Sequence, residues 1–479
     1  MSDERAIRSI CVGGGGIVGL SAALAFARAM PPTKVEVVET PPDPAALADC
    51  VPIALPGVER FHASIGVDEA ELVRGGIATH HLGTVFANWS AAGEPWVHAF
   101  GAYGKGAGAI PFDQIWVRAH QLGQALPYDR YSVGAALIRA GKFVHPSRDA
   151  DFIGSRFLYG LRFDPDRYRE RLRADAERAG IAFRAADVAD VERSEAGGIA
   201  SLRLTDGTRI EADLFVDCTG PGARLIGAVD DSFEDWSAWL AFDRLRSSEE
   251  SIDGVPAPSD GVIARDEGWT AQWPLPGRTM TAAMSRDGEG VAITRGRRLR
   301  PWVGNVLALG DSATALDPLH GFNLDMAHSA ILLALELLPG RDFHPLETEE
   351  YNRRAEQVTR RVRDFVVLHY LRSGRTHGVW RDLADVEPPD SLARTLDQYQ
   401  HRGRMPFHEE ESVTRDSWTA ALLGMGQVPR NADPQAGAVS LDQALPAMQR
   451  LVGEIDQAVA SLPSYPEYLS RMTAAAATR

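Results

Sequence analysis

Apolar residues near the start of the chain fall into a strand, helix, strand pattern. Residues 7–12 form an apolar run of the length expected for a buried parallel strand, and residues 34–38 form a second such run. Between these runs, residues 20–30 are rich in alanine and leucine, which favours a helix. The pattern predicts a βαβ unit at the start of an α/β domain.

Later segments also carry strand or helix patterns. Alternating polar and apolar residues predict strands over 183–217, with a hairpin turn at Asp206-Gly207. Residues 160–182 have the pattern of an amphipathic helix, and residues 301–311 that of one buried strand. Further helices are expected at about 323–338, at 349–370 and, as the final helix, at 441–461.

A glycine motif lies between the first predicted strand and the first helix. Gly14, Gly16 and Gly19 satisfy the pattern GxGxxG. Glycines at these positions let the backbone turn tightly and approach a pyrophosphate, toward which the helix N-terminus carries partial positive charge. Glu39 follows the second strand, where an acid accepts hydrogen bonds from a ribose hydroxyl. This context predicts a dinucleotide site; the alternative is a glycine-rich turn in another α/β fold.

Two later strand ends favour FAD over NAD as that dinucleotide. The strand predicted at 214–217 enters a glycine turn that contains Gly220, and the strand predicted at 301–311 ends in Asp311. An acid between a strand and a helix is where flavoproteins bind the ribityl chain or pyrophosphate, although Asp311 as a simple helix cap is the alternative. Because no second dinucleotide fingerprint is present in the sequence, we expect a separate NAD(P)H:flavin reductase to supply reduced FAD.

Charge and cysteine content narrow the classes of partner. The 479 residues include 50 Lys+Arg against 65 Asp+Glu, a formal net charge of −15, so we expect neither nucleic acid nor membrane as a partner. The three cysteines are far apart and form no CxxC pair, and we predict neither a disulfide framework nor a cysteine zinc site and assign no metal ligands. We expect a cytoplasmic protein, because no segment has the pattern of a transmembrane helix or of a secretory signal.

Several motifs resemble the flavin-dependent tryptophan halogenase family, and the resemblance covers nearly the whole chain. They are the glycine-rich opening, Leu82-Gly83-x-x-Phe86-x-Asn88-Trp89, and the segments 212–220, 301–305, 363–370 and 417–418. The resemblance implies the use of reduced FAD, O2 and halide on an indole or another electron-rich aromatic.

The same resemblance implies an α/β fold with two modules. We expect residues 1–345 to form a Rossmann-like FAD-binding module of the aromatic hydroxylase and halogenase type. Substrate-binding sheet regions are expected as insertions at about 40–160 and 232–300. Residues 346–479 are expected to form a mainly helical module that covers the substrate, and the sequence leaves a homodimer open.

The family's chemistry also depends on a lysine and a glutamate. The resemblance implies that the lysine captures or hydrogen-bonds hypohalous acid at the substrate, and that the glutamate assists it. In the matching segment 78–83 the lysine position holds His81, and in the segment 317–323 the glutamate position holds His320. The chain has only three lysines, at Lys34, Lys105 and Lys142.

Further site residues follow from the same matches. The family binds halide through backbone N–H groups of the loop in which Phe322 and Asn323 now stand, and we assign both residues to the cofactor side of the site. A tryptophan signature that screens flavin from substrate appears as Trp269 and Trp273, with only the first in register. The remaining residues assigned to substrate are His80 and Trp418.

Histidine stands at both positions where the family has its lysine and its glutamate, which favours a different reaction over a loss of activity. Histidine donates and accepts protons near neutral pH, so we expect His81 and His320 to act as acid and base in an oxygenation of a small aromatic. The alternatives are packing residues in a dead site and a metal site that includes His80. For the whole protein, the alternatives are a halogenase that uses histidine and a flavin-binding protein without turnover.

Overall fold

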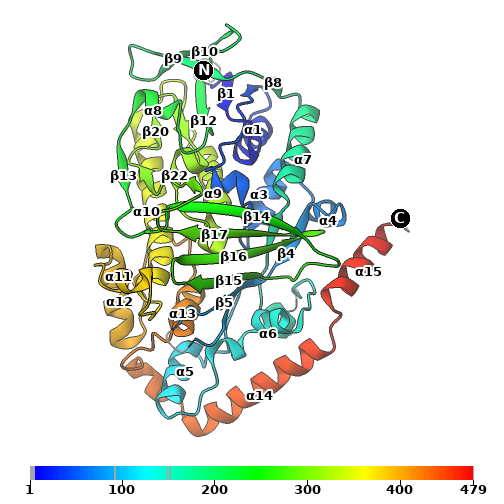
Figure 1. Ribbon diagram of the computed structural model, residues 1–479, viewed down its shortest axis with the longest axis vertical. Helices are drawn as coiled ribbons and strands as arrows, with labels where there is room; N and C mark the ends of the chain where they lie inside the picture. The colour runs from blue at the N-terminus through cyan, green and yellow to red at the C-terminus, as the bar shows by residue number, and fades with distance from the viewer. Residues whose placement is uncertain (1–5, 91–92, 148, 150–152, 478–479) are drawn as a thin grey trace. The chain divides into compact units, whose positions relative to one another are not determined.

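The strand, helix, strand pattern at the start of the chain folds as predicted. In the computed structural model β1 (Ser9–Gly13) and β2 (Lys34–Val38) are adjacent parallel strands, and α1 (Ile17–Ala29) connects them (Figure 1). The residues that the structure describes are 6–90, 93–147, 149 and 153–477.

The two strands belong to a six-stranded, mostly parallel sheet. Its order is β20-β21-β12-β1-β2-β8, and the strands not yet introduced are β8 (Ala182–Arg184), β12 (Leu214–Asp217), β20 (Trp302–Val303) and β21 (Val306–Ala308). Gly13, the last residue of β1, stands in register with Val38 on one side and Asp217 on the other. The loops that follow these strands therefore meet at one sheet edge, where α/β proteins bind their ligands.

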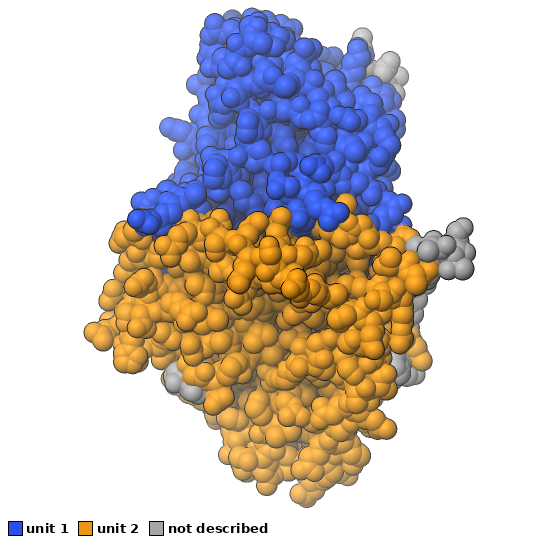
Figure 2. All heavy atoms as spheres, turned by 45° about the vertical axis from the view of Figure 1, so that its right-hand side comes forward, with its two compact units in different colours: residues 1–72, 162–244, 289–360 blue, residues 73–161, 245–288, 361–479 orange. Residues whose placement is uncertain are grey.

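The chain divides into two units, each built from three segments. Figure 2 colours them separately. Unit 1 comprises residues 1–72, 162–244 and 289–360, and unit 2 comprises residues 73–161, 245–288 and 361–479.

Unit 1 contains the six-stranded sheet and the helices that cover it. α1 packs against α7 (Pro165–Arg178) and α9 (Phe322–Glu336). The other elements assigned to it are α2 (Leu47–Cys50), α3 (Val58–Ile65), α8 (Ile226–Val229), β3 (Ile53–Ala54), β9 (Val188–Arg193), β10 (Ile199–Leu204), β11 (Arg209–Ile210), β13 (Phe233–Asp235), β18 (Val291–Ala292), β19 (Gly296–Arg298), β22 (Thr314–Ala315), η3 (Gly310–Ser312) and η4 (Leu319–Gly321).

Unit 2 combines an antiparallel sheet with helices. In the sheet, β15 pairs with β16 and β16 with β17, while β15 also runs parallel to β5. The elements of unit 2 are β4 (Ala78–His81), β5 (Gly83–Ala87), β6 (Trp96–Ala99), β15 (Asp260–Arg265), β16 (Gly268–Leu275), β17 (Arg278–Ser285), α5 (Phe112–Gln121), α6 (Val133–Ala140), α11 (Val379–Ala384), α12 (Asp390–Arg402), α13 (Arg415–Gly424), α14 (Leu441–Ala460), α15 (Tyr465–Ala477), η1 (Tyr128–Tyr131), η2 (Ile153–Ser155) and η5 (Pro434–Ala438).

Four elements begin in one unit and end in the other. They are α4 (Glu69–Arg74), β7 (Gly160–Phe163), β14 (Arg244–Ser251) and α10 (Pro345–Leu371).

The α/β fold and most elements agree with the sequence-based predictions, and three segments differ. Residues 160–163 are the strand β7 rather than the start of a helix, because Asp164 caps α7 by accepting from the Arg167 amide. The predicted strand 301–311 is a hairpin of β20 and β21, turned at Gly304 with a φ of 53°. The helix at 441–460 is not the last one, because α15 follows it.

A buried carboxylate ties the edge of the unit 1 sheet together. The side chain of Asp217, at the end of β12, accepts hydrogen bonds from the amides of Leu225 and Ile226 at 2.8 and 2.9 Å. It also accepts from the Thr219 amide at 3.0 Å and from the Ser312 hydroxyl at 3.2 Å. One carboxylate thus fixes the turn after β12 and the loop after β21.

Replacing Asp217 by alanine is expected to lower the free energy of unfolding by about 3 kcal/mol, because several buried donors lose a charged acceptor at once. Asp217→Asn keeps one carbonyl oxygen and is expected to lose less. Urea unfolding followed by circular dichroism measures both variants. Equal stability of Asp217→Ala and the wild type would contradict this role.

Candidate functional site

The glycine motif forms a tight turn in unit 1 that no larger residue fits. Gly14 has a φ of 117°, and a Cβ atom there would overlap the carbonyl of Cys218. A Cβ atom on Gly19 would overlap the carbonyl of Gly14. The Gly14 amide donates to the carbonyl of Val38 at 2.9 Å, which fixes the turn against β2. The turn brings the backbone of Gly14, Gly16 and Gly19 to the N-terminus of α1.

A carboxylate lies directly on this helix N-terminus. The Val18 amide donates to Asp49 Oδ1 at 3.0 Å, and a Cβ atom on Gly16 would overlap the same carboxylate. The side chain of Asp49 is 8% exposed, and burial raises its pKa to about 6. Asp49 comes from α2 and was not among the residues predicted from sequence.

Asp311 lies in η3, directly after β21, and contacts the same segment. Its Oδ2 accepts from the Ala48 amide at 3.0 Å, while its Oδ1 is buried and has no hydrogen-bond partner among the described residues. Burial raises the pKa of Asp311 to about 7, and the nearby charge of Asp49 adds to this effect. Asp311 thus caps the first turn of α2, as the alternative expects, and its role in cofactor binding stays a prediction.

Two further predicted residues lie in the same unit. Glu39, after β2, pairs with Arg173 of α7, and its side chain is 19% exposed. Gly220 has a φ of 81°, and its carbonyl accepts from the Ser312 hydroxyl at 2.9 Å. Through Ser312, the Gly220 turn and the Asp311 loop are held side by side.

These residues of unit 1 fit FAD. The glycine turn brings the backbone to the N-terminus of α1, where this motif binds a pyrophosphate and where the Asp49 carboxylate lies in this structure. The unpartnered Asp311 Oδ1 is an acceptor for a ribityl hydroxyl, and the partly exposed Glu39 is an acceptor for a ribose hydroxyl. At the start of α9, Phe322 is buried and the Asn323 amide group donates to the carbonyl of Leu316 at 2.8 Å. The cofactor roles of Phe322 and Asn323 stay predictions.

His320 has a strained backbone. It lies in η4 with a φ of 65°, in the left-handed region that costs a non-glycine residue about 1–2 kcal/mol. The residue is 7% exposed, and its ring centroid lies 6.0 Å from that of Phe322. Strain of this kind concentrates at functional sites, which makes His320 a candidate functional residue.

In unit 2, His81 forms a buried pair with an acid that sequence reasoning missed. His81 Nε2, at the end of β4, lies 3.0 Å from Asp260 Oδ2 at the start of β15, and both side chains are at most 4% exposed. Both ring nitrogens, Nδ1 and Nε2, are buried without a hydrogen-bond partner among the described residues, so the contact with Asp260 is a close approach without hydrogen-bond geometry. The edge of the ring packs on Phe100, with centroids 5.1 Å apart.

His80 faces a different set of neighbours, as successive residues of a strand do. Its Nδ1 lies 3.0 Å from the hydroxyl of Tyr465, and its ring stacks on Phe143 at 4.0 Å between centroids. Tyr159 and Tyr468 complete an aromatic cluster around it. The adjacent histidines point apart, and the substrate role of His80 stays a prediction.

The three tryptophans assigned to substrate are buried in unit 2. Trp269 Nε1 donates to the hydroxyl of Tyr370 at 3.1 Å, and Trp418 packs under Arg361, whose guanidinium carbon lies 4.0 Å from the ring centroid. Trp273 is 3% exposed. These contacts account for core packing, and contact with substrate stays a prediction for all three.

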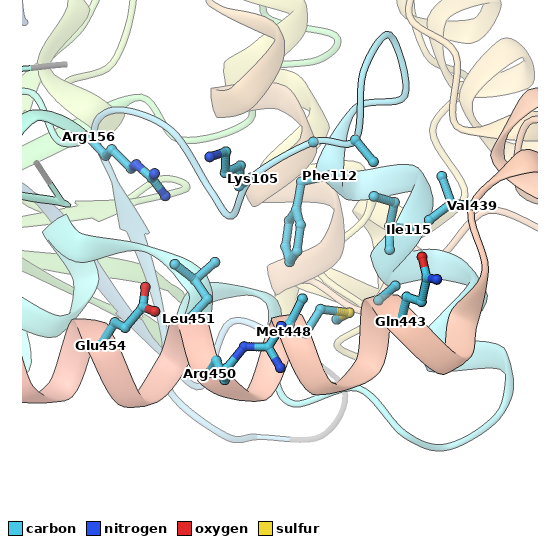
Figure 3. A pocket seen from close by; sticks show the side chains of 14 residues that line it. Lys105, Phe112, Ile115, Arg156, Val439, Gln443, Met448, Arg450, Leu451 and Glu454 are labelled. Carbon is cyan, nitrogen blue, oxygen red and sulfur yellow. The ribbon is translucent and has the colours of Figure 1, made fainter. Parts of the chain in front are cut away.

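Unit 2 also contains a pocket of about 410 Å³ that holds none of the predicted site residues. Helix α14 forms one wall with Met448 and Leu451, and Lys105 and Arg156 lie across from it (Figure 3). Phe112 of α5 contributes to its apolar lining. Lys105, one of the three lysines of the chain, thus lines a pocket that is separate from the predicted site residues.

The sheet, its glycine turn and the two loops beside it define an FAD-dependent enzyme with a Rossmann-like module. Residues 9–288 and 278–441 match the family model described as tryptophan halogenase, so the chain belongs to this family of flavin-dependent enzymes, which use FAD. Among the described residues, no helix combines the length and apolar character that crossing a membrane requires.

The similarity to known proteins extends over nearly the whole chain. The flavin-dependent halogenase BrvH from Brevundimonas sp. BAL3 superposes with a TM-score of 0.91 at 30% identity, covering 97% of this chain and 99% of that one. A flavin-dependent halogenase from Xanthomonas campestris gives 0.90 at 28% identity, covering 98% and 99%. The tryptophan 7-halogenase RebH from Lentzea aerocolonigenes is 25% identical over 97% of this chain and 98% of its own.

Asp311 makes stability dependent on pH. The pKa of Asp311 is about 7 in the folded protein against an ordinary value of 3.8. The free energy of unfolding therefore falls as the pH rises from about 4 to above 7, because the buried side chain resists ionisation. Asp311→Asn is therefore expected to raise the unfolding free energy at pH 8 by up to about 4 kcal/mol and to change it little at pH 4. Thermal unfolding of FAD-free protein at both pH values checks this, and equal effects at the two would contradict it.

The strain at His320 predicts a difference between two substitutions. His320→Gly is expected to be more stable than His320→Ala by about 1 kcal/mol, because only glycine adopts a φ of 65° freely. Urea unfolding of the two variants measures the difference. A more stable alanine variant would show that the backbone is not strained.

Proposed function

We propose that the protein hydroxylates a small aromatic substrate, such as an indole, a tryptophan-like compound or a phenol. Reduced FAD, supplied by a separate NAD(P)H:flavin reductase, provides two electrons. One atom of O2 then enters an aromatic C–H bond as a hydroxyl group and the other leaves as water. The similarity to RebH, a tryptophan 7-halogenase, supports an aromatic substrate.

The observation that carries this proposal is the pair of His81 with Asp260. A carboxylate 3.0 Å from an imidazole nitrogen lies where the orienting acid stands in enzymes that use histidine as a general base. The resemblance places a lysine at position 81, where an ammonium group holds the electrophilic halogen species. An imidazole paired with an acid is better suited to take a proton from a phenol O–H or an indole N–H.

His320 is the second acid or base in this proposal. Its backbone is held in a strained conformation, and it stands at the position that the resemblance gives to a glutamate. A histidine side chain accepts a proton, as the glutamate does, and is also able to donate one. Both histidines are buried, so the proposal requires that His81 become accessible when substrate binds.

Halogenation is the second candidate function, supported by family membership. In that case a histidine positions hypohalous acid by hydrogen bonding, and halide becomes a further substrate. A flavin-binding protein without turnover is the third candidate. The three differ in what they release from the same mixture of substrate, O2, reduced FAD and halide.

Product analysis separates these functions. FAD-loaded protein, a flavin reductase and NADH are mixed with indole, tryptophan or phenol under ¹⁸O2, with and without bromide, and the products are examined by mass spectrometry. We expect ¹⁸O in the aromatic product whether or not bromide is present. Brominated product alone would favour halogenation, and consumption of NADH without any aromatic product would favour the third candidate.

Substitution of the histidines tests their part in the reaction. His81→Ala and His320→Ala are each expected to lower turnover about 100-fold or more while FAD stays bound, the range for loss of a general acid or base. The exposed His377→Ala serves as the matched control and is expected to keep full turnover. Unchanged turnover in both variants would remove the histidines from the mechanism.

A further inference from the structure

We propose that Asp49 is an internal competitor of FAD: its carboxylate occupies the place of the FAD pyrophosphate at the start of α1, and FAD must displace it to bind. The proposal concerns cofactor binding alone and does not depend on which reaction the enzyme catalyses.

The geometry of the α1 N-terminus is the first observation. Asp49 Oδ1 accepts from the Val18 amide at 3.0 Å, one of the N–H groups that a helix leaves free at its start. The carboxylate lies so close to Gly16 that a Cβ atom there would overlap it. A side-chain anion therefore rests on the glycine motif itself, where the fold directs a pyrophosphate.

Two anions do not share this position. Two negative charges a few ångströms apart repel each other, and the repulsion is stronger where little water lies between them. Asp49 is 8% exposed, so water screens it little. The pyrophosphate of FAD carries negative charge and needs the same backbone N–H groups, so one of the two must leave.

Asp311 supplies the second, independent observation. It is 7% exposed, its Oδ2 accepts from the Ala48 amide at 3.0 Å, and its Oδ1 is a buried acceptor without a partner among the described residues. The residue next to Asp49 is thus held by the acid that we assign to FAD. Movement of residues 47–50 would free both the helix N-terminus and a second oxygen of Asp311, so one displacement opens two parts of the FAD site.

The consequence is a flavin that binds reversibly. FAD binding is weakened because the contacts that Asp49 makes at the α1 N-terminus must be broken before FAD takes their place. An enzyme that receives reduced FAD from a separate protein benefits from such exchange, because oxidised FAD has to leave before reduced FAD enters.

The test compares FAD affinity in variants of the full chain freed of flavin. Asp49→Ala removes the competitor, Asp49→Asn keeps its shape without its charge, and Asp68→Asn is a control for net charge on an exposed acid of the same unit. We expect Asp49→Ala to bind FAD about tenfold tighter, equivalent to about 1.4 kcal/mol, by titration of flavin fluorescence. Asp49→Asn is expected to bind FAD more tightly than the wild type, and Asp68→Asn to match it.

Amide hydrogen exchange at Val18, measured without FAD, provides a readout apart from activity. Asp49→Ala should exchange faster than the wild type, and inorganic pyrophosphate should restore its protection while leaving the wild type unchanged. Faster exchange with unchanged or weaker FAD affinity would show that Asp49 caps the helix without competing, which overturns the proposal. Unchanged exchange in Asp49→Ala would overturn it as well, because the contact would then be absent in solution.

Asp49→Asn, which has nearly the same shape as the wild type, keeps the test decisive when the alanine variant does not fold. Circular dichroism and thermal unfolding identify an alanine variant that fails to fold, in which case Asp49→Asn decides the matter. FAD affinity of Asp49→Asn at or below that of the wild type would then overturn the proposal.

Discussion

The carboxylate of Asp217 holds the FAD side of unit 1 in shape. It stands in register with Gly13, the residue that precedes the glycine motif, and it accepts hydrogen bonds from the turn after β12 and from Ser312 beside Asp311. The cost of burying this charge is offset by these donors, which come from segments far apart in the sequence. The turn after β12 and the Asp311 loop both depend on this one anchor for their relative position.

Negative charge is the other organising feature of the same unit. Asp49 and Asp311 are both buried, and burial raises the pKa of each toward neutrality. A site built to receive an anionic cofactor thus contains two acids of its own. Such an arrangement costs stability in the absence of cofactor, as is common where proteins keep a functional group in an unfavourable environment.

Sequence reasoning reached the parts of the site that depend on local order. The tight turn at Gly14, Gly16 and Gly19 was predictable because it needs glycine at fixed spacing between a strand and a helix. The position of Asp311 directly after a strand was predictable as well, while the cofactor roles of these residues stay predictions. Asp49 and Asp260 were not, since each acts on a residue that only the fold brings near: Val18 is 31 positions from Asp49. No periodic pattern marks such pairs, and burial of His81 likewise depends on tertiary packing.

The contact between His80 and Tyr465 affects the order in which the two units fold during synthesis. The two residues are 385 positions apart, and the hydroxyl of Tyr465 meets both the ring and the amide of His80. Unit 1 ends at residue 360, whereas unit 2 takes its last segment from residues 361–479. During synthesis on the ribosome, unit 1 has all its segments while β4 still lacks its aromatic partner. Unit 2 therefore completes its fold only after residue 465 has been synthesised, which is later than the synthesis of the last segment of unit 1.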